Sequence, residues 1–171
     1  MAKFLNVAIA PSVDTGTTDG VPSGANDLID SGQNFLTTVS VGDLVHNTTD
    51  DAWHVVSAVV DDDNLTLVTG TVATAKAYVI YDGNSSNYTN QLVSAEGIKL
   101  AAQATASTTT LTYASGGADV LTITHGIVTG VAFRTAVEAA IVKAFSVGNR
   151  PSATAELAIP SGVVVTGIAI A

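Results

Sequence analysis

The chain has 171 residues, of which 47% are hydrophobic and 12% charged, and its formal net charge is −9. Only six lysine and arginine residues are present, which argues against nucleic-acid binding, and the absence of cysteine excludes disulfides and thiolate metal sites. With 23 valines and 23 threonines, the composition favours a β-rich fold, because β-branched side chains suit a pleated, half-buried surface. No apolar run approaches the length of a membrane-spanning helix, and the N-terminal segment lacks the apolar stretch of a signal peptide, so we expect no membrane partner.

The first half of the chain predicts one strand followed by a compact series of short strands. Residues 3–10 are apolar and strand-like, whereas residues 11–26 are rich in Gly, Pro, Ser, Thr and Asp and predict a linker or long loop. Residues 82–90 form a second polar stretch of the same kind. Turn signals between these stretches separate five predicted strands: residues 34–40, 44–47, 53–60, 65–69 and 77–81. Short strands at this spacing predict a small antiparallel β-barrel or sandwich.

A hairpin and a helix dominate the second half of the chain. Residues 91–104 contain one or two strands, and residues 108–113 and 120–125 face each other across a Gly-containing turn. The apolar pattern then changes to a helical period, and we expect a helix over about residues 131–147. Two further strands are expected at residues 155–159 and 162–171.

The predicted helix has one apolar face and recognisable ends. Thr129 is placed to cap its start and Gly148 to end it. Arg134 and Glu138 lie four residues apart, so they are expected to pair on the outer face. The apolar positions recur at helical spacing: Phe133, Val137, Ala140, Ile141, Ala144 and Phe145.

The acidic residues divide the chain into two parts. Residues 11–90 contain eleven aspartates and one base, Lys76, for a net charge of −10, whereas residues 91–171 hold four acids and four bases. Because both chain ends are apolar and strand-like, we expect them to share one sheet beside the predicted hairpin. The predicted fold is therefore mainly β, of the α+β class. Residues 1–10 and 91–171 form a discontinuous β-rich docking and assembly domain with the one helix, and residues 11–90 form an inserted, acidic small β-barrel domain. The alternative is a single body whose surface hairpins carry acidic turns.

Few residues are candidates for a metal site. Asp61, Asp62 and Asp63 are the best set, because a bound Ca²⁺ would relieve the repulsion between three neighbouring carboxylates. The spaced ligands of an EF-hand are missing, however, and a solvated hairpin turn explains the same residues. His46 and His54 flank one predicted hairpin, but two ligands do not complete a zinc site.

The sequence contains no recognisable catalytic constellation. It has neither a Gly-x-Ser-x-Gly nucleophile elbow nor a phosphate-binding loop. We therefore expect no enzymatic activity and no cofactor. Trp53 is a candidate for stacking on a sugar, although a core or cross-strand position explains this residue as well.

Two sets of residues resemble proteins of tailed bacteriophages. Residues 28–35 (LIDSGQNF) and 41–50 (VGDLVHNTTD), with the strands that follow them, resemble small β modules of tailed-phage virion proteins. The N-terminal Met-Ala-Lys-Phe-Leu segment, the hairpin of residues 108–125 and the helix of residues 133–145 resemble short virion proteins of marine and freshwater cyanophages. These motifs are structural, and no catalytic residue carries over from them.

The resemblance implies a structural protein of the virion, most like a capsid decoration (cement) protein on the exterior of the shell. Such a protein would bind the major capsid protein or another virion protein, with its acidic domain towards solvent, and a homotrimer is the favoured assembly. The apolar terminal strands supply the expected interface residues: Phe4, Leu5, Val7, Ile9, Val164, Ile168 and Ile170. Two alternatives remain: a tail, neck, baseplate or fibre component, and a glycan-binding receptor-recognition module that uses Trp53.

Overall fold

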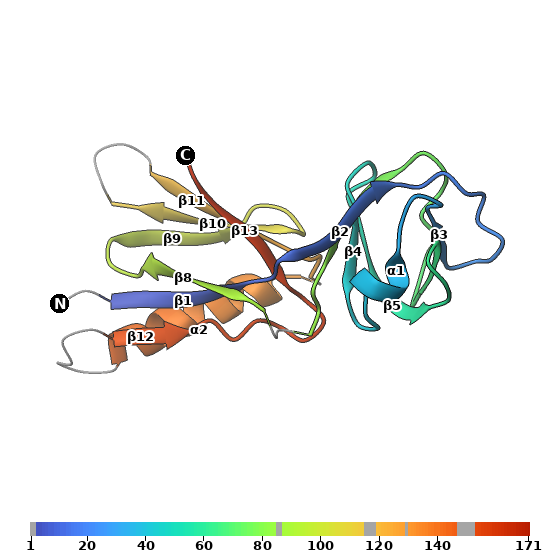
Figure 1. Ribbon diagram of the computed structural model, residues 1–171. Helices are drawn as coiled ribbons and strands as arrows, with labels where there is room; N and C mark the ends of the chain where they lie inside the picture. Colours follow the sequence, from blue (N-terminus) through green and yellow to red (C-terminus); the bar gives the residue numbers. More distant parts are fainter. Residues whose placement is uncertain (1–2, 85–86, 115–118, 129, 147–152) are drawn as a thin grey trace. The chain divides into compact units, whose positions relative to one another are not determined.

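The structure of the chain, a computed structural model, describes residues 3–84, 87–114, 119–128, 130–146 and 153–171 (Figure 1). It is mainly β, with 45% strand and 12% helix, as the composition predicts. The chain divides into two compact units. Unit 1 comprises residues 1–9 and 88–171, and unit 2 comprises residues 10–87, so the divisions lie close to the steps in charge and composition.

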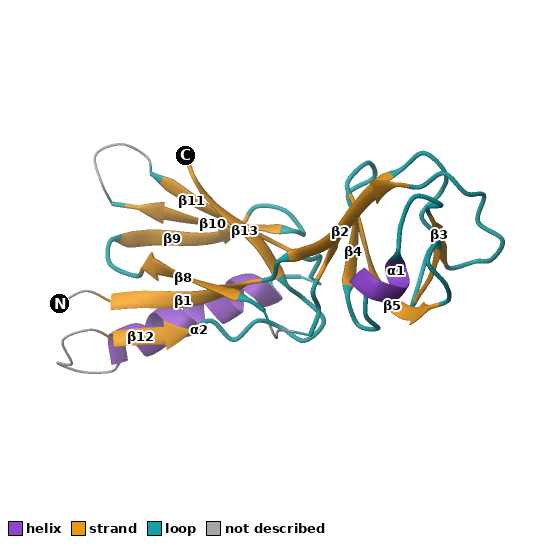
Figure 2. Cartoon of the chain, viewed as in Figure 1, coloured by secondary structure: helices purple, strands orange, loops and turns teal. Residues whose placement is uncertain are grey.

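Unit 2 is built on one antiparallel sheet of six strands (Figure 2). The strands follow the order β2-β7-β4-β5-β6-β3 across the sheet, and β2 and β3 at its two ends do not pair with each other. Their bounds are β2 Ser12–Thr17, β3 Asp27–Ile29, β4 Leu44–Asn47, β5 Ala52–Val59, β6 Asn64–Leu67 and β7 Ala77–Tyr81. The predicted barrel is therefore not closed. Strand β3 has only three residues, and on the side away from β6 its carbonyls accept backbone N–H groups of Asp19, Gly20 and Val72.

Two segments of unit 2 differ from the prediction. Residues 34–40 were expected to form a strand, but α1 (Phe35–Thr38) is a single helical turn, in which the Asn34 carbonyl accepts backbone N–H groups of Thr37 and Thr38. The predicted loop over residues 11–26 contains β2, which pairs with β7. Because β2 has no buried side chain, it lacks the alternation by which a strand is recognised in a sequence.

Unit 1 contains a sheet of seven strands that brings the two chain ends together. In the order β12-β1-β13-β11-β10-β9, Ile9 of β1 lies opposite Val165 of β13, and β8 pairs with β1. The bounds are β1 Lys3–Ile9, β8 Thr89–Ser94, β9 Ile98–Gln103, β10 Thr108–Tyr113, β11 Val120–His125, β12 Ala153–Glu156 and β13 Val165–Ile170. The prediction that both terminal segments share a sheet with the hairpin β10–β11 is confirmed.

One long helix, α2 (Ala132–Ser146), packs against strands β1, β9 and β12 of unit 1 (Figure 2). Its buried residues are Phe133, Val137, Ala140 and Ala144. The ion pair between Arg134 and Glu138 is present, with the guanidinium Nε 3.2 Å from the carboxylate. The sequence places Phe145 on the apolar face, but it is 52% exposed, because at this turn it is Ala144, fully buried, that faces the core. The predicted caps Thr129 and Gly148 lie outside the described residues.

Candidate assembly surface

The predicted interface residues on the terminal strands divide between the core and the surface of unit 1. Leu5 and Val7 are fully buried and Val164 is 2% exposed, so these three residues stabilise the unit itself and do not form a contact surface. Alternation along β1 turns Leu5 and Val7 towards the core, where they join the cluster that α2 covers. The other predicted residues remain partly or largely accessible: Phe4, Ile9, Ile168 and Ile170.

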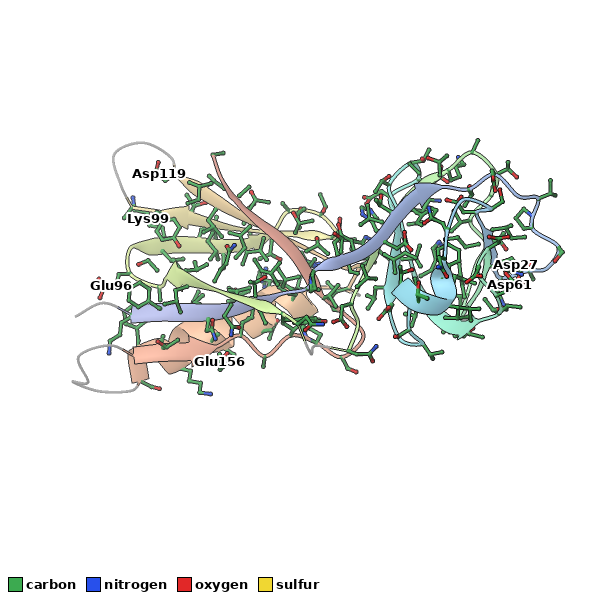
Figure 3. The ribbon with its side chains drawn as sticks, viewed as in Figure 1. Asp27, Asp61, Glu96, Lys99, Asp119 and Glu156 are labelled. Carbon is green, nitrogen blue, oxygen red and sulfur yellow. The ribbon has the colours of Figure 1, made fainter. Side chains whose placement is uncertain are left out.

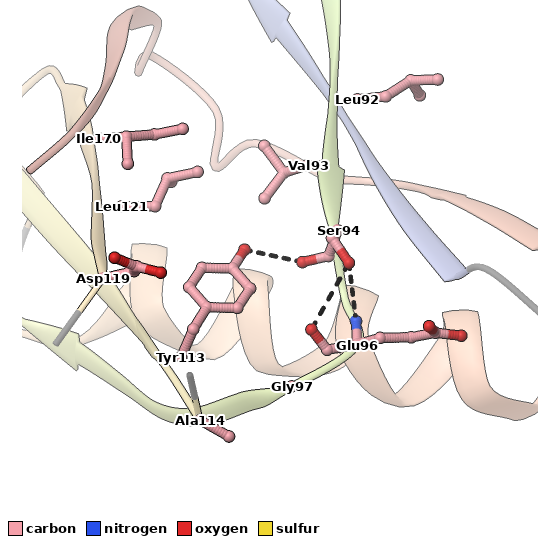
Figure 4. A pocket seen from close by; sticks show the side chains of 10 residues that line it. All are labelled: Leu92, Val93, Ser94, Glu96, Gly97, Tyr113, Ala114, Asp119, Leu121 and Ile170. Atoms are coloured by element: carbon pink, nitrogen blue, oxygen red, sulfur yellow. Dashed lines mark hydrogen bonds between the residues drawn. The ribbon is translucent and has the colours of Figure 1, made fainter. Parts of the chain in front are cut away.

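A pocket of about 400 Å³ lies in unit 1 where β8 separates from the strands β10, β11 and β13 (Figure 4). In the close view, the Val93 side chain points across it towards Leu121 and Ile170, while Leu92 points away. The remaining residues around the pocket are Ser94, Glu96, Gly97, Tyr113, Ala114 and Asp119. The sequence did not indicate this pocket, because its walls come from β8, the β10–β11 hairpin and β13, which are separated along the chain.

Polar groups lie at one side of this largely apolar pocket. The Tyr113 hydroxyl donates a hydrogen bond of 2.8 Å to the backbone carbonyl of Ser94. Burial raises the pKa of Tyr113, so its hydroxyl stays protonated and remains a donor. The hydroxyl oxygen of Ser94 accepts the backbone N–H of Glu96 at 3.2 Å. Among the described residues that line the pocket there is no histidine, lysine or arginine, and the arrangement favours the packing of apolar groups.

Unit 1 exposes several large apolar side chains, and its positive and negative charges nearly balance. The two largest exposed fractions there are 77% for Ile170 and 68% for Val142. Other large apolar side chains of the unit are also exposed: Leu92, Leu100, Ile127, Val131 and Phe145. Over the divisions seen in the structure, unit 1 has a net charge of +1 and unit 2 a net charge of −10. Both units carry charged side chains, among them Glu96 and Lys99 of unit 1 and Asp27 and Asp61 of unit 2 (Figure 3).

The aspartates proposed for calcium form the turn between β5 and β6. All three side chains are exposed, and the Asp61 carboxylate accepts the backbone N–H of Asp63 at 3.0 Å. In the part of the chain that the structure describes, no three His, Asp or Glu side chains gather as a metal site would require. The geometry of Asp61, Asp62 and Asp63 is that of a solvated hairpin turn.

The two histidines of unit 2 do not converge. His46 lies opposite Trp53 and His54 lies opposite Val45, so the two imidazoles belong to opposite faces of the sheet. His46 Nε2 is 2.9 Å from a carboxylate oxygen of Asp51. His54 Nδ1 instead donates to the Thr69 carbonyl at 2.8 Å. A shared zinc site is therefore ruled out by their placement.

Trp53 belongs to a row of stacked rings on unit 2. The His46 imidazole lies parallel to the indole with ring centroids 4.3 Å apart, and the Tyr81 ring is stacked at 5.8 Å. The indole is half-buried, and His46 occupies one of its faces. Trp53 therefore occupies a cross-strand position beside His46. Because His46 covers one face of the indole, only part of the ring is accessible to a sugar.

A buried histidine in unit 1 was not singled out by its sequence context. His125 is fully buried, its Nδ1 donates to the Gly126 carbonyl at 2.7 Å, and Nε2 is 3.1 Å from the Thr109 hydroxyl. The imidazole stacks on Phe133 of α2 with ring centroids 3.9 Å apart. Burial lowers its pKa, so the neutral ring is the native form. The only sequence signal is its position in the alternation of β11.

None of the described helices is both long and apolar enough to cross a bilayer. No protein-family model matches the chain, and neither the curated proteins nor the solved structures include a significant match to it.

Proposed function

We propose that this chain is a non-enzymatic structural protein of a tailed-phage virion, and that it decorates the outside of the capsid. Unit 1 binds the shell or neighbouring copies, and unit 2 extends into solvent. The phage assignment is based on the sequence resemblance. The assignment of binding to unit 1 and of the solvent-facing role to unit 2 is based on the two units and their different net charges.

The difference in net charge between the two units carries this proposal, since large apolar side chains are exposed on both. A net charge of −10 on unit 2 repels other acidic surfaces and keeps particles dispersed. Unit 1 has almost no net charge and exposes large side chains such as Ile170 and Val142. A body without net charge meets no long-range repulsion when it binds a neighbouring surface, so unit 1 suits the binding role better than unit 2 does.

Purified particles test the proposal. Quantitative mass spectrometry should find the chain in hundreds of copies per particle, and electron microscopy should place its density on the outer face of the shell. A chain that is absent from the particles would refute the proposal. A handful of copies at the tail, neck or baseplate would instead establish the alternative virion role.

Glycan recognition is the less favoured alternative, because His46 already covers one face of Trp53. If it is correct, Trp53→Ala abolishes binding to host polysaccharide while the far-ultraviolet circular dichroism spectrum stays unchanged. Under the capsid proposal, neither the wild type nor this variant binds the polysaccharide.

A further inference from the structure

Strand β8 of unit 1 has one edge that no described strand covers. Its six residues pair with β1 in regular antiparallel register, from Thr89 opposite Ile9 to Ser94 opposite Phe4. Thr89, Asn90, Gln91 and Leu92 are all exposed. An uncovered strand edge presents unpaired backbone groups, which readily bind another strand.

The backbone groups on this edge can be identified from the pairing. Ala95 N–H donates to the Lys3 carbonyl at 2.8 Å, so this opposed pair is a hydrogen-bonded pair of the antiparallel ladder. Because such pairs alternate, the backbone groups of Asn90, Leu92 and Ser94 point away from β1. The Ser94 carbonyl does accept the hydroxyl of Tyr113, which confirms this direction.

The other open edges among the described strands carry features that discourage pairing. Strand β9 has Lys99 and an irregular register with β10, and β2 has Asp14 and a register shift against β7. Strand β13, beyond its one pair with β1, contains Gly167 and is irregular against β11. Strand β12 is short and contains Glu156, and the carbonyls on the outer edge of β3 already accept backbone N–H groups of neighbouring loops. Charges, bulges and short length are the usual protections of a free edge.

Strand β8 lacks these protections, and the only described contact on its outward backbone groups is the Tyr113 hydroxyl on one lone pair of the Ser94 carbonyl. Its sequence, Thr-Asn-Gln-Leu-Val-Ser, contains no charge, proline or glycine, and its pairing with β1 has no register shift. Leu92, in the middle of the strand, is 61% exposed. A regular and uncharged edge with an exposed leucine is one that a native protein normally covers.

We propose that β8 pairs in antiparallel fashion with β8 of a second copy of this chain, across a twofold axis at Leu92. The outward backbone groups are symmetric about this residue, so Leu92 of each copy lies opposite the other, and Asn90 lies opposite Ser94 of the second copy. This pairing buries the two exposed leucines against each other. The near-neutral charge of unit 1 adds no repulsion beside the pairing edge, whereas the net charge of −9 on each full chain opposes association and is screened by salt. The proposal is independent of the virion role, and it builds a dimer instead of the trimer expected from the resemblance.

The mass of the full chain in solution is the first test. A strand pair of this length buries less than the roughly 800 Å² per partner of a standard interface, so the dimer should be concentration-dependent. Sedimentation velocity from about 1 to about 100 µM chain should show the mass rise from 17.2 kDa to twice that value. A single-chain mass throughout, or an assembly of three or more chains, would overturn the pairing.

A matched pair of variants locates the contact. Leu92→Lys places two like charges opposite each other across the axis and should weaken the dimer at least about tenfold. Leu100→Lys is the control, because Leu100 is similarly exposed, at 57%, on the open edge strand β9. It should leave the dimer unchanged, and circular dichroism checks that both variants are folded. Equal effects of the two variants would contradict the proposal.

Cross-linking gives a readout that does not depend on affinity. The chain has no cysteine, so Leu92→Cys introduces a single thiol. Opposed residues of a hydrogen-bonded antiparallel pair have Cα atoms about 5.5 Å apart, within the range that a disulfide spans. Mild oxidation should yield a covalent dimer from Leu92→Cys and none from Leu100→Cys, whereas the reverse result would refute the twofold axis at Leu92.

Discussion

The buried side chain of His125 makes the stability of unit 1 depend on pH. Both ring nitrogens have partners in the neutral form, since Nδ1–H donates to the Gly126 carbonyl and Nε2 accepts from the Thr109 hydroxyl. The pKa of this histidine is lowered from 6.5, first by burial. The unfolded chain therefore takes up a proton at a higher pH than the native protein does, and this difference favours unfolding in acid.

We expect the stability contributed by His125 to be fully present above about pH 6.5 and to be lost as the pH falls towards the lowered native pKa. The urea midpoint of unit 1 should fall between pH 7 and pH 5, as followed by circular dichroism. In His125→Phe, which retains a ring against Phe133 and cannot titrate, the midpoint should be lower overall and less dependent on pH. An equally steep dependence in that variant would assign the effect to other groups.

In unit 2, the buried carboxylate of Asp30 is stabilised by a hydrogen bond from Tyr78. The hydroxyl of Tyr78 donates to Asp30 at 2.8 Å, and both residues are buried. Gln33 and the backbone N–H of Gly32 also donate to this carboxylate. Burial, followed by the neighbouring Asp30, raises the pKa of Tyr78, so the phenol remains a donor at every ordinary pH.

Tyr78→Phe should destabilise unit 2 by about 1–3 kcal/mol, because a buried carboxylate loses one of its donors. Urea unfolding followed by the fluorescence of Trp53 measures this change. Asp30→Asn in the same background should recover part of the loss, since a neutral amide is less costly to leave short of a donor. A Tyr78→Phe variant as stable as the wild type would show that water replaces the hydroxyl.

The two phenylalanines of α2 are a matched pair with opposite environments. Phe133 is fully buried against His125, whereas Phe145 is 52% exposed. Phe133→Ala should cost about 3–5 kcal/mol of unfolding free energy through the cavity that it leaves. Phe145→Ala should cost less than about 1 kcal/mol. Thermal unfolding by circular dichroism compares the variants, and similar losses would mean that Phe145 is also packed in solution.

Strands with clear alternation and flanking turns were predictable to the residue. The bounds of β4, β7, β10 and β11 agree with those expected from the sequence, because each strand alternates buried and partly exposed side chains or lies between turn residues. Strand β2 and helix α1 were missed for the opposite reason. Neither has more than one buried residue, so local sequence carries no periodic signal and tertiary pairing decides their conformation.

The interface residues were harder to predict than the strands that carry them. Alternation separates Leu5 and Val7 from Phe4, but it does not tell which face of β1 a helix will cover. The pocket beside Tyr113 likewise depends on where β8 leaves its neighbours. Such features follow from packing between distant segments, and a single sequence does not encode them in a local pattern.

At the level of the complete chain, the two units have separate hydrophobic cores. Separate cores of this kind favour unfolding in two independent steps. The only tryptophan, Trp53, lies in unit 2, so its fluorescence reports that unit alone.

We expect Phe133→Ala to lower the unfolding midpoint seen by circular dichroism at 222 nm, where α2 of unit 1 dominates the signal, and to leave the Trp53 fluorescence midpoint unchanged. Tyr78→Phe should have the reverse effect. A shift of both signals by either variant would show that the two units unfold as one cooperative body.

The way in which the chain leaves and re-enters unit 1 has a practical consequence for engineering. Ile9 and Thr89 lie directly opposite each other, in the hydrogen-bonded positions of the β1–β8 ladder, so residues 10–88 depart and return at adjacent points. An Asn-Gly dipeptide in their place would join the two strands as a tight hairpin. We therefore expect unit 1 to fold after deletion of the acidic unit, and a foreign domain with closely spaced ends could be inserted at the same point.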